Sequence, residues 1–174
     1  MATNAEAAKP PSWLLRALIG RNPKRTLVRI AVLVAVCFVV FKFVLVPVHV
    51  DGGSMLPTYR ENGVNFVNRL AYLFHEPRRG DVVAIGLRAG EHVMYLKRIV
   101  GLPGETVAFH KGQLFINGKL LDEPYVKLPG NWEHEPEPDG PDQYYFVGDN
   151  RDMPWDDHVH GRRERNWIVG KILL

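Results

Sequence analysis

The sequence is poor in cysteine, with one, Cys37, among its 174 residues. A single thiol cannot form an internal disulfide, so the fold has to be held by its core in any compartment. Cys37 lies within an apolar run, where a free cysteine behaves as a small apolar residue. We therefore assign it no redox or catalytic role.

A strong excess of charge is also missing. Twenty-two basic and 19 acidic residues give a formal net charge of +3, and 46% of the residues are apolar, as in a globular chain. The basic excess lies before residue 30, where six basic residues accompany one acid: Lys9, Arg16, Arg21, Lys24, Arg25 and Arg29, with Glu6. Such a mild charge does not indicate a nucleic-acid partner, and the length suits one domain plus a short anchor.

Residues 30–48 carry a single charge, Lys42. As a helix these 19 residues measure about 28 Å, close to the hydrocarbon thickness of a bilayer. A buried core helix would need partners on every side, and a cleaved secretory signal would be shorter and followed by a small-residue cleavage pattern. We predict a lasting transmembrane helix in which Lys42 reaches the nearer interface.

Orientation follows from the basic residues before the span, because positively charged loops stay in the cytoplasm. We predict a cytoplasmic segment at 1–29, a transmembrane helix at 30–48 and an extracytoplasmic domain at 49–174. The chain would cross the inner (plasma) membrane once.

Helical periodicity is scarce after residue 49, and short runs of β-forming residues alternate with turn signals. Strands are expected at 64–67, 81–85, 92–100, 106–110, 113–116, 119–121, 144–147 and 167–173, with turns at 111–112 and 117–118. Residues 128–143 hold four prolines and are expected to form a loop. The predicted fold class is mainly β, a compact antiparallel domain on one membrane helix.

The first chemical motif is residues 53–58, which read Gly-Ser-Met-Leu-Pro-Thr shortly after the predicted span. Gly52 and Gly53 free the backbone before Ser54, and Pro57 stiffens it afterwards. Such a turn can present the serine hydroxyl and its own N–H to a substrate carbonyl. Taken alone, the motif is more typical of an ordinary glycine-serine turn.

The second motif centres on Lys97. Strand alternation places Val93, Tyr95, Lys97 and Ile99 on one face, so the amine is expected among apolar side chains. Desolvation disfavours the ammonium and lowers its pKa, and a neutral amine can accept the proton of a serine hydroxyl. The alternative is a hydrated lysine at a strand edge.

The third motif is residues 148–152, Gly-Asp-Asn-Arg-Asp, followed by Asp156. Carboxylates beside an arginine suit a hydrogen-bonded loop that braces a neighbouring site. The alternatives are a solvated turn or a divalent-cation loop, which would need more convergent oxygen ligands. His158 and His160 stand two apart, a spacing more typical of surface residues than of a metal site. We expect neither a metal nor a cofactor.

In combination, these motifs resemble those of the type I signal peptidases, proteases with a Ser-Lys dyad. The serine segment 53–58, the Arg-Gly-Asp-Val-Val strand 79–83, the lysine segment 97–105 and the acidic segment 148–152 occur in the family's order. The resemblance runs from about Val46 to Gly170, after a membrane helix in the expected place.

The resemblance implies Ser54 as nucleophile, Lys97 as general base, and Asp149, Arg151 and Asp156 as supports. It implies a membrane-bound serine endopeptidase that removes signal peptides from exported precursor proteins. Its partners would be those precursors, with small residues at the first and third positions before the cut, and the lipid bilayer.

The sequence departs from the family pattern at three positions. Gly52 stands where the family often has a serine that contributes to the oxyanion hole, which leaves Gly53 and Ser54 to supply it with another donor. Pro154 stands where a serine can orient the lysine, and His158 where arginine is common. A specialised maturation peptidase of the same clan, serving a conjugation or secretion system, and a catalytically weak membrane-tethered binding module remain alternatives.

Overall fold

The structure, a computed structural model, describes residues 22–86 and 94–173. It divides into two units, residues 1–41 and 42–174, which are described separately. The basic residues Lys9, Arg16 and Arg21 and the expected strand start at 92–93 lie outside the described residues.

The N-terminal element is the α-helix α2, Pro23–Val39, which a π-helical turn, Val40–Val44, extends. Residues Lys24–Val44 form the one helix in the described part that is long and apolar enough to cross a membrane, with a mean hydropathy of 2.6. Leu33 and Phe38 are examples of its exposed apolar side chains. This composition fits a single membrane span.

The bounds of this helix differ from the expected 30–48. It begins at Pro23, because proline is well tolerated in the first turn, where its missing N–H has no helical partner. It ends at Val44, and the next residues form strand β1, Leu45–His49. Pro47 explains the end, since proline cannot donate in a helix interior and disfavours the helical conformation of the residue before it.

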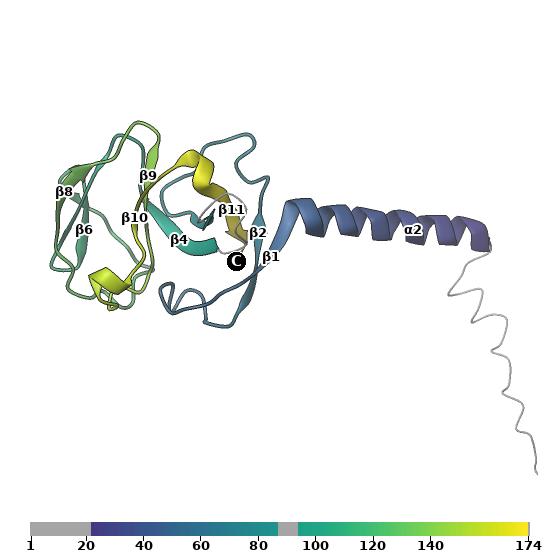
Figure 1. Cartoon of the computed structure of the whole chain (residues 1–174), viewed down its shortest axis with the longest axis horizontal. Coiled ribbons are helices and arrows are strands. Elements are labelled where there is room, and N and C mark those ends of the chain that lie inside the picture. The colour runs from purple at the N-terminus through teal and green to yellow at the C-terminus, as the bar shows by residue number, and fades with distance from the viewer. Residues whose placement is uncertain (1–21, 87–93, 174) are drawn as a thin grey trace, which may run out of the picture. The chain divides into compact units, whose positions relative to one another are not determined.

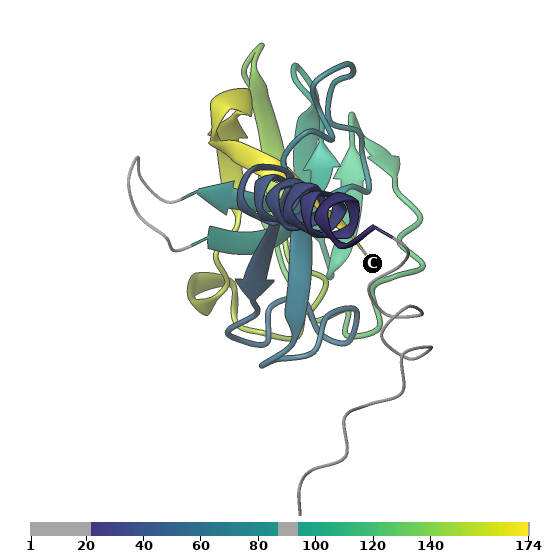
Figure 2. The ribbon, with the colours of Figure 1, turned by 90° about the vertical axis from the view of Figure 1, so that its right-hand side faces the viewer.

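The second unit consists of two antiparallel sheets (Figure 1). The larger has the order β1-β2-β11-β3-β4-β9-β10. Its further strands are β2 Val64–Asn68, β3 Val82–Gly86, β4 Met94–Gly101, β9 Gln143–Val147, β10 Gly161–Glu164 and β11 Ile168–Leu173. Figure 2 shows the paired strands β1 and β2 side by side.

The smaller sheet has the order β7-β6-β5-β8. Its strands are β5 Thr106–His110, β6 Gln113–Ile116, β7 Lys119–Leu120 and β8 His134–Pro138. Short 3₁₀ turns occupy Trp155–Asp157 and Arg165–Trp167. The mainly antiparallel β fold predicted from the sequence is confirmed.

Three strands were not expected: β1, β8 and β10. The interpretation of 128–143 as a loop is wrong in part, because β8 lies within it and pairs with β5. Pro136 and Pro138 led to the prediction of a loop, because proline usually interrupts a strand. They are accommodated because β8 is an edge strand, where a missing N–H costs no ladder hydrogen bond on the open side.

Strands β4 and β9 contribute to both halves of the core. Ile99 and Phe146 pack in one apolar cluster, whereas Val100 and Tyr145 pack in another that includes the small sheet. At the junction, a Cβ on Gly101 would lie 2.5 Å from Asp139 Oδ2 and 2.7 Å from Tyr145 Cβ. The glycine therefore permits the close approach of the two sheets beside the strand that carries Lys97.

Candidate active site

Ser54 lies in the loop between β1 and β2. Gly52 has a φ of +88°, a left-handed conformation that residues with a Cβ rarely adopt. Asn150 holds the loop from the opposite side: its Nδ2 donates to the Gly53 carbonyl and its N–H to the Ser54 carbonyl, each at 3.0 Å. The segments 53–58 and 148–152, distant in sequence, are thus joined at the serine.

The junction depends on Gly148. A Cβ there would lie 2.1 Å from the Ser54 carbonyl oxygen and 2.6 Å from His158 Nε2. Since real Cβ atoms do not approach a backbone oxygen so closely, no other residue fits without displacing the Ser54 loop.

Lys97 lies in the middle of β4, paired with Val83 of β3, and only 2% of it is exposed. Its Nζ is 2.8 Å from Ser54 Oγ. Within residues 22–86 and 94–173, this hydroxyl is the only hydrogen-bonding partner of Nζ. Tyr95 lines the same hollow as Lys97, and Ile99 packs with the residues around that hollow, as strand alternation predicts; Val93 lies outside the described residues.

Burial lowers the pKa of Lys97 from 10.5 to about 8, and the nearby Asp149 carboxylate opposes the shift. The desolvated ammonium is disfavoured, so a substantial fraction of the amine is neutral near pH 8. A neutral amine in hydrogen-bond contact with a hydroxyl can accept its proton. The arrangement can therefore generate a serine nucleophile.

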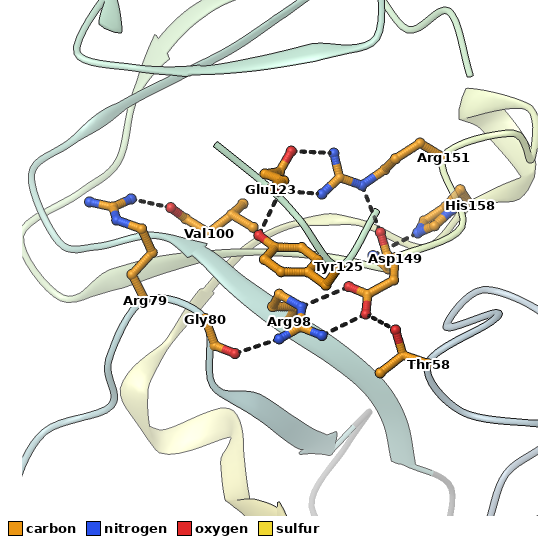
Figure 3. A network of polar contacts seen from close by, with 11 residues as sticks. Thr58, Arg79, Gly80, Arg98, Val100, Glu123, Tyr125, Asp149, Arg151 and His158 are labelled. Carbon is orange, nitrogen blue, oxygen red and sulfur yellow. Dashed lines mark hydrogen bonds and ion pairs between the residues drawn. The ribbon is translucent and has the colours of Figure 1, made fainter. Parts of the chain in front are cut away.

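A buried ion pair contacts the segment that carries Ser54 through Thr58 (Figure 3). Asp149, which is fully buried, accepts hydrogen bonds from Arg98 Nε at 2.8 Å and Nη2 at 2.6 Å. The same carboxylate accepts a hydrogen bond from Thr58 Oγ1 at 2.6 Å. Because Thr58 belongs to the segment that carries Ser54, Asp149 connects the Ser54 loop to β4.

A second buried ion pair stands beside the first. Arg151 donates to both carboxylate oxygens of Glu123, at 2.6 and 3.1 Å, and to the Gly148 carbonyl at 2.7 Å. Tyr125 joins the two pairs: its hydroxyl donates to Glu123 at 2.7 Å, and its ring lies 3.8 Å from the Arg98 guanidinium carbon (Figure 3). The network fixes the backbone of segment 148–152.

The interpretation of His158 and His160 as surface residues is wrong. His158 is 2% exposed, and its Nε2 accepts the Gly148 N–H at 2.8 Å. Burial, together with the charge of Lys97, lowers the pKa of His158 to about 3, so the ring is neutral with its proton on Nδ1. His160 is half-buried, with its ring centroid 3.7 Å from that of Trp155.

With this geometry in place, comparisons with known proteins assign the family. The model of the family described as signal peptidase, peptidase S26, matches residues 24–174. The chain belongs to the peptidase S26 family. The match covers the apolar helix and all the described strands of both sheets.

Individual relatives support the same family assignment. The chain is 34% identical over 131 residues to a probable signal peptidase I-2 of Synechocystis sp., covering 72% of this chain and 60% of that protein. It is 37% identical over 133 residues to signal peptidase I S of Bacillus subtilis, covering 70% of this chain and 71% of that protein. The chain thus spans less than two thirds of the Synechocystis relative.

Among solved structures, a signal peptidase I from Enterococcus faecalis is similar, with a TM-score of 0.45 and 25% identity. The similarity covers 56% of this chain and 97% of that one.

Against the S26 family pattern, the structure explains one departure. The left-handed backbone of Gly52 would be strained with a serine in its place. Pro154 precedes the 3₁₀ turn at Trp155–Asp157 and supplies no side-chain donor to Lys97. His158, at a position where arginine is common in the family, accepts a hydrogen bond from the Gly148 N–H.

Asp156 is the one predicted support that stands apart. It is exposed, and it makes no hydrogen bond or ion pair to any residue in the described part of the chain. Arg98, Glu123 and Tyr125 instead complete the network, and the sequence motifs assigned no role to any of them. Arg98 pairs with Asp149, which lies 51 residues further along the chain.

Proposed function

We propose that this chain is a membrane-bound serine endopeptidase that removes signal peptides from exported precursor proteins, with Ser54 as nucleophile and Lys97 as general base. The contact of 2.8 Å between Ser54 Oγ and the buried Nζ of Lys97 carries the proposal. Membership of the S26 family supports the reaction class.

Acylation begins when neutral Lys97 takes the proton of Ser54 Oγ, which attacks the scissile carbonyl carbon. The resulting oxyanion needs hydrogen-bond donors. The Ser54 N–H is one candidate, since it donates to no acceptor within residues 22–86 and 94–173. When the C–N bond breaks, the Lys97 ammonium returns its proton to the leaving amine, and the signal peptide remains as an ester on Ser54.

Deacylation reverses these roles. Lys97, neutral again, removes a proton from a water molecule, which attacks the ester carbonyl. The ester C–O bond breaks, Oγ regains a proton from Lys97, and the signal peptide leaves as a carboxylic acid that releases its proton to the solvent. A single amine thus serves as base and acid in both halves of the reaction.

A hollow of about 300 Å³, including its mouth, lies beside Ser54. Gly52, Met55 and Leu96 are among its lining residues. Its mixed lining beside Ser54 supports the binding of small side chains before the scissile bond, as the family implies.

The proposed topology places the segment before the apolar helix in the cytoplasm, the helix Lys24–Val44 in the membrane in place of the predicted 30–48, and the domain that begins with β1 outside. The basic residues before the apolar helix support this orientation. Reporter fusions at residues 60 and 174 should both be active only outside the cytoplasm, and an inside-active fusion at either position would contradict the topology.

The full chain in detergent should cleave a synthetic signal-peptide substrate. Ser54→Ala should lower kcat/KM by about 10³-fold or more, with Ser12→Ala, the other serine of the sequence, as control. Equal cleavage by wild type and Ser54→Ala would refute the proposed nucleophile. If wild type bound the peptide without cleaving it, the binding-module alternative would hold, and cleavage of one dedicated precursor alone would favour a specialised peptidase.

A further inference from the structure

A second hollow adjoins the dyad and has no role in the mechanism above. It encloses about 320 Å³, including its mouth. Its lining includes Ile85, Tyr95, Lys97, Phe146, His160 and Arg163. We call it the Lys97 hollow, and the one described above the Ser54 hollow.

Each of the two hollows is lined by one of the two dyad residues. The Ser54 hollow is lined by Ser54 and not by Lys97, the Lys97 hollow by Lys97 and not by Ser54, and Tyr95 lines both. A peptide crossing the dyad therefore meets one hollow on the serine side and the other on the lysine side.

Peptide-bond cleavage distinguishes these sides. The acyl half of the substrate becomes bonded to Ser54 Oγ, whereas the leaving amine has to lie near the Lys97 Nζ that protonates it. The residue after the scissile bond carries this amine. Its side chain is therefore placed on the lysine side.

We infer that the Lys97 hollow receives the side chain of the first residue after the scissile bond, and that Arg163 selects an acidic side chain there. This inference rests on the proposed function. None of the described residues that line the hollow is acidic, and Arg163 of β10 is one of the lining residues.

The depths of the two cations decide which acid fits. Lys97 is buried, whereas Arg163 is exposed, with its Nη1 2.7 Å from the Arg162 carbonyl oxygen. A carboxylate deep in the hollow would stabilise the Lys97 ammonium and impair the base. A glutamate long enough to reach Arg163 keeps its charge away from Nζ, so glutamate should be preferred to aspartate.

His160 forms part of the wall. Burial lowers its pKa, which favours a neutral ring near pH 7, and its Nδ1 lies 3.4 Å from the Tyr145 hydroxyl. It therefore adds a polar surface without a second positive charge. Arg163 remains the charged group that discriminates between substrates.

The test compares signal-peptide substrates that differ only in the first residue after the cut, which is Glu, Asp, Gln or Lys. Using the full chain in detergent at low salt, wild type should show a kcat/KM about 5-fold higher for Glu than for Lys, the upper range for an exposed ion pair. The ratio should fall towards 1 in ~0.5 M salt, where exposed charges are screened.

Arg163→Gln should bring the Glu-to-Lys ratio close to 1, and Arg163→Glu should invert it. Lys119→Glu makes the same charge change on β7, which does not line the hollow, and should leave the ratio at the wild-type value. The salt series on wild type tests the inference even if an Arg163 variant fails to fold.

The possible outcomes distinguish failure of this inference from failure of the proposed function. Ser54-dependent cleavage of all substrates at equal rates would overturn the inference and leave the proposed function standing, as would a preference unchanged in Arg163→Glu. Absence of Ser54-dependent cleavage would overturn both.

Discussion

Gly148 packs against the carbonyl of Ser54, so that a Cβ at position 148 would lie 2.1 Å from that oxygen. Segment 148–152 thereby fixes the position of the Ser54 loop. Asn150 and Asp149 add hydrogen bonds to the same loop, at the Ser54 carbonyl and the Thr58 hydroxyl.

Gly148→Ala should displace the Ser54 loop. Overpacking of this kind typically costs about 1–3 kcal/mol, and the shift should also reduce kcat by separating Oγ from Nζ. Thermal unfolding and single-turnover cleavage measure the two effects. Gly86→Ala is the matched control for stability, because its Cβ would make only an ordinary contact, at 3.7 Å from Val169 Cγ2. Equal unfolding temperatures for the two variants would contradict the packing argument.

Asp149→Asn should leave the Arg98 guanidinium buried without its counter-charge. Breaking a buried pair from one side costs about 3–5 kcal/mol. The pair of Arg165 and Glu76 provides the contrast, since 36% and 75% of these side chains are exposed. Glu76→Gln should cost less than about 1 kcal/mol. Denaturant unfolding of both variants tests this, and similar losses would show that the Arg98–Asp149 pair is no structural brace.

The buried amine of Lys97 should destabilise the fold at neutral pH. Its pKa falls from 10.5 to about 8 on folding, so between these values the unfolded chain binds more protons and stability rises with pH. Below pH 8 the full penalty applies, about 3 kcal/mol. Lys97→Met should therefore be more stable than wild type at pH 7, and the gap should shrink towards pH 10.5. A gap independent of pH would contradict the lowered pKa.

The sequence predicted the elements whose signals are local. Alternation of apolar residues predicted β5 and β6 with their bounds, and the apolar run predicted a membrane helix. The pairing of Ser54 with Lys97 could be predicted from the order of the family's motifs. It could not be predicted from local spacing, because the two residues are 43 positions apart. Glu123 and Tyr125 were not predictable as partners of Arg151 and Arg98. Their contacts form only when segments distant in sequence pack together.

Two errors share a physical cause. Pro136 and Pro138 suggested a loop because proline breaks ladders, but an edge strand needs fewer backbone donors. His158 suggested a hydrated surface, but the neutral imidazole is buried with its Nε2 accepting a backbone N–H. In both cases tertiary context outweighed the local preference of the residue.

Lys97→Arg should be as inactive as Lys97→Met. Arginine keeps the positive charge but stays protonated at any working pH, so it cannot accept the Ser54 proton. Cleavage of the signal-peptide substrate by the two variants, each checked for folding by circular dichroism, decides the point. Near-wild-type activity of Lys97→Arg would exclude a lysine base.

The pH dependence of kcat/KM for wild-type cleavage tests the central claim most directly. Burial lowers the pKa of Lys97 to about 8, so the rate should rise with pH through an apparent pKa near 8 and level off above it. A rate that climbed only above about pH 10, where a hydrated lysine titrates, would contradict a buried Lys97 base.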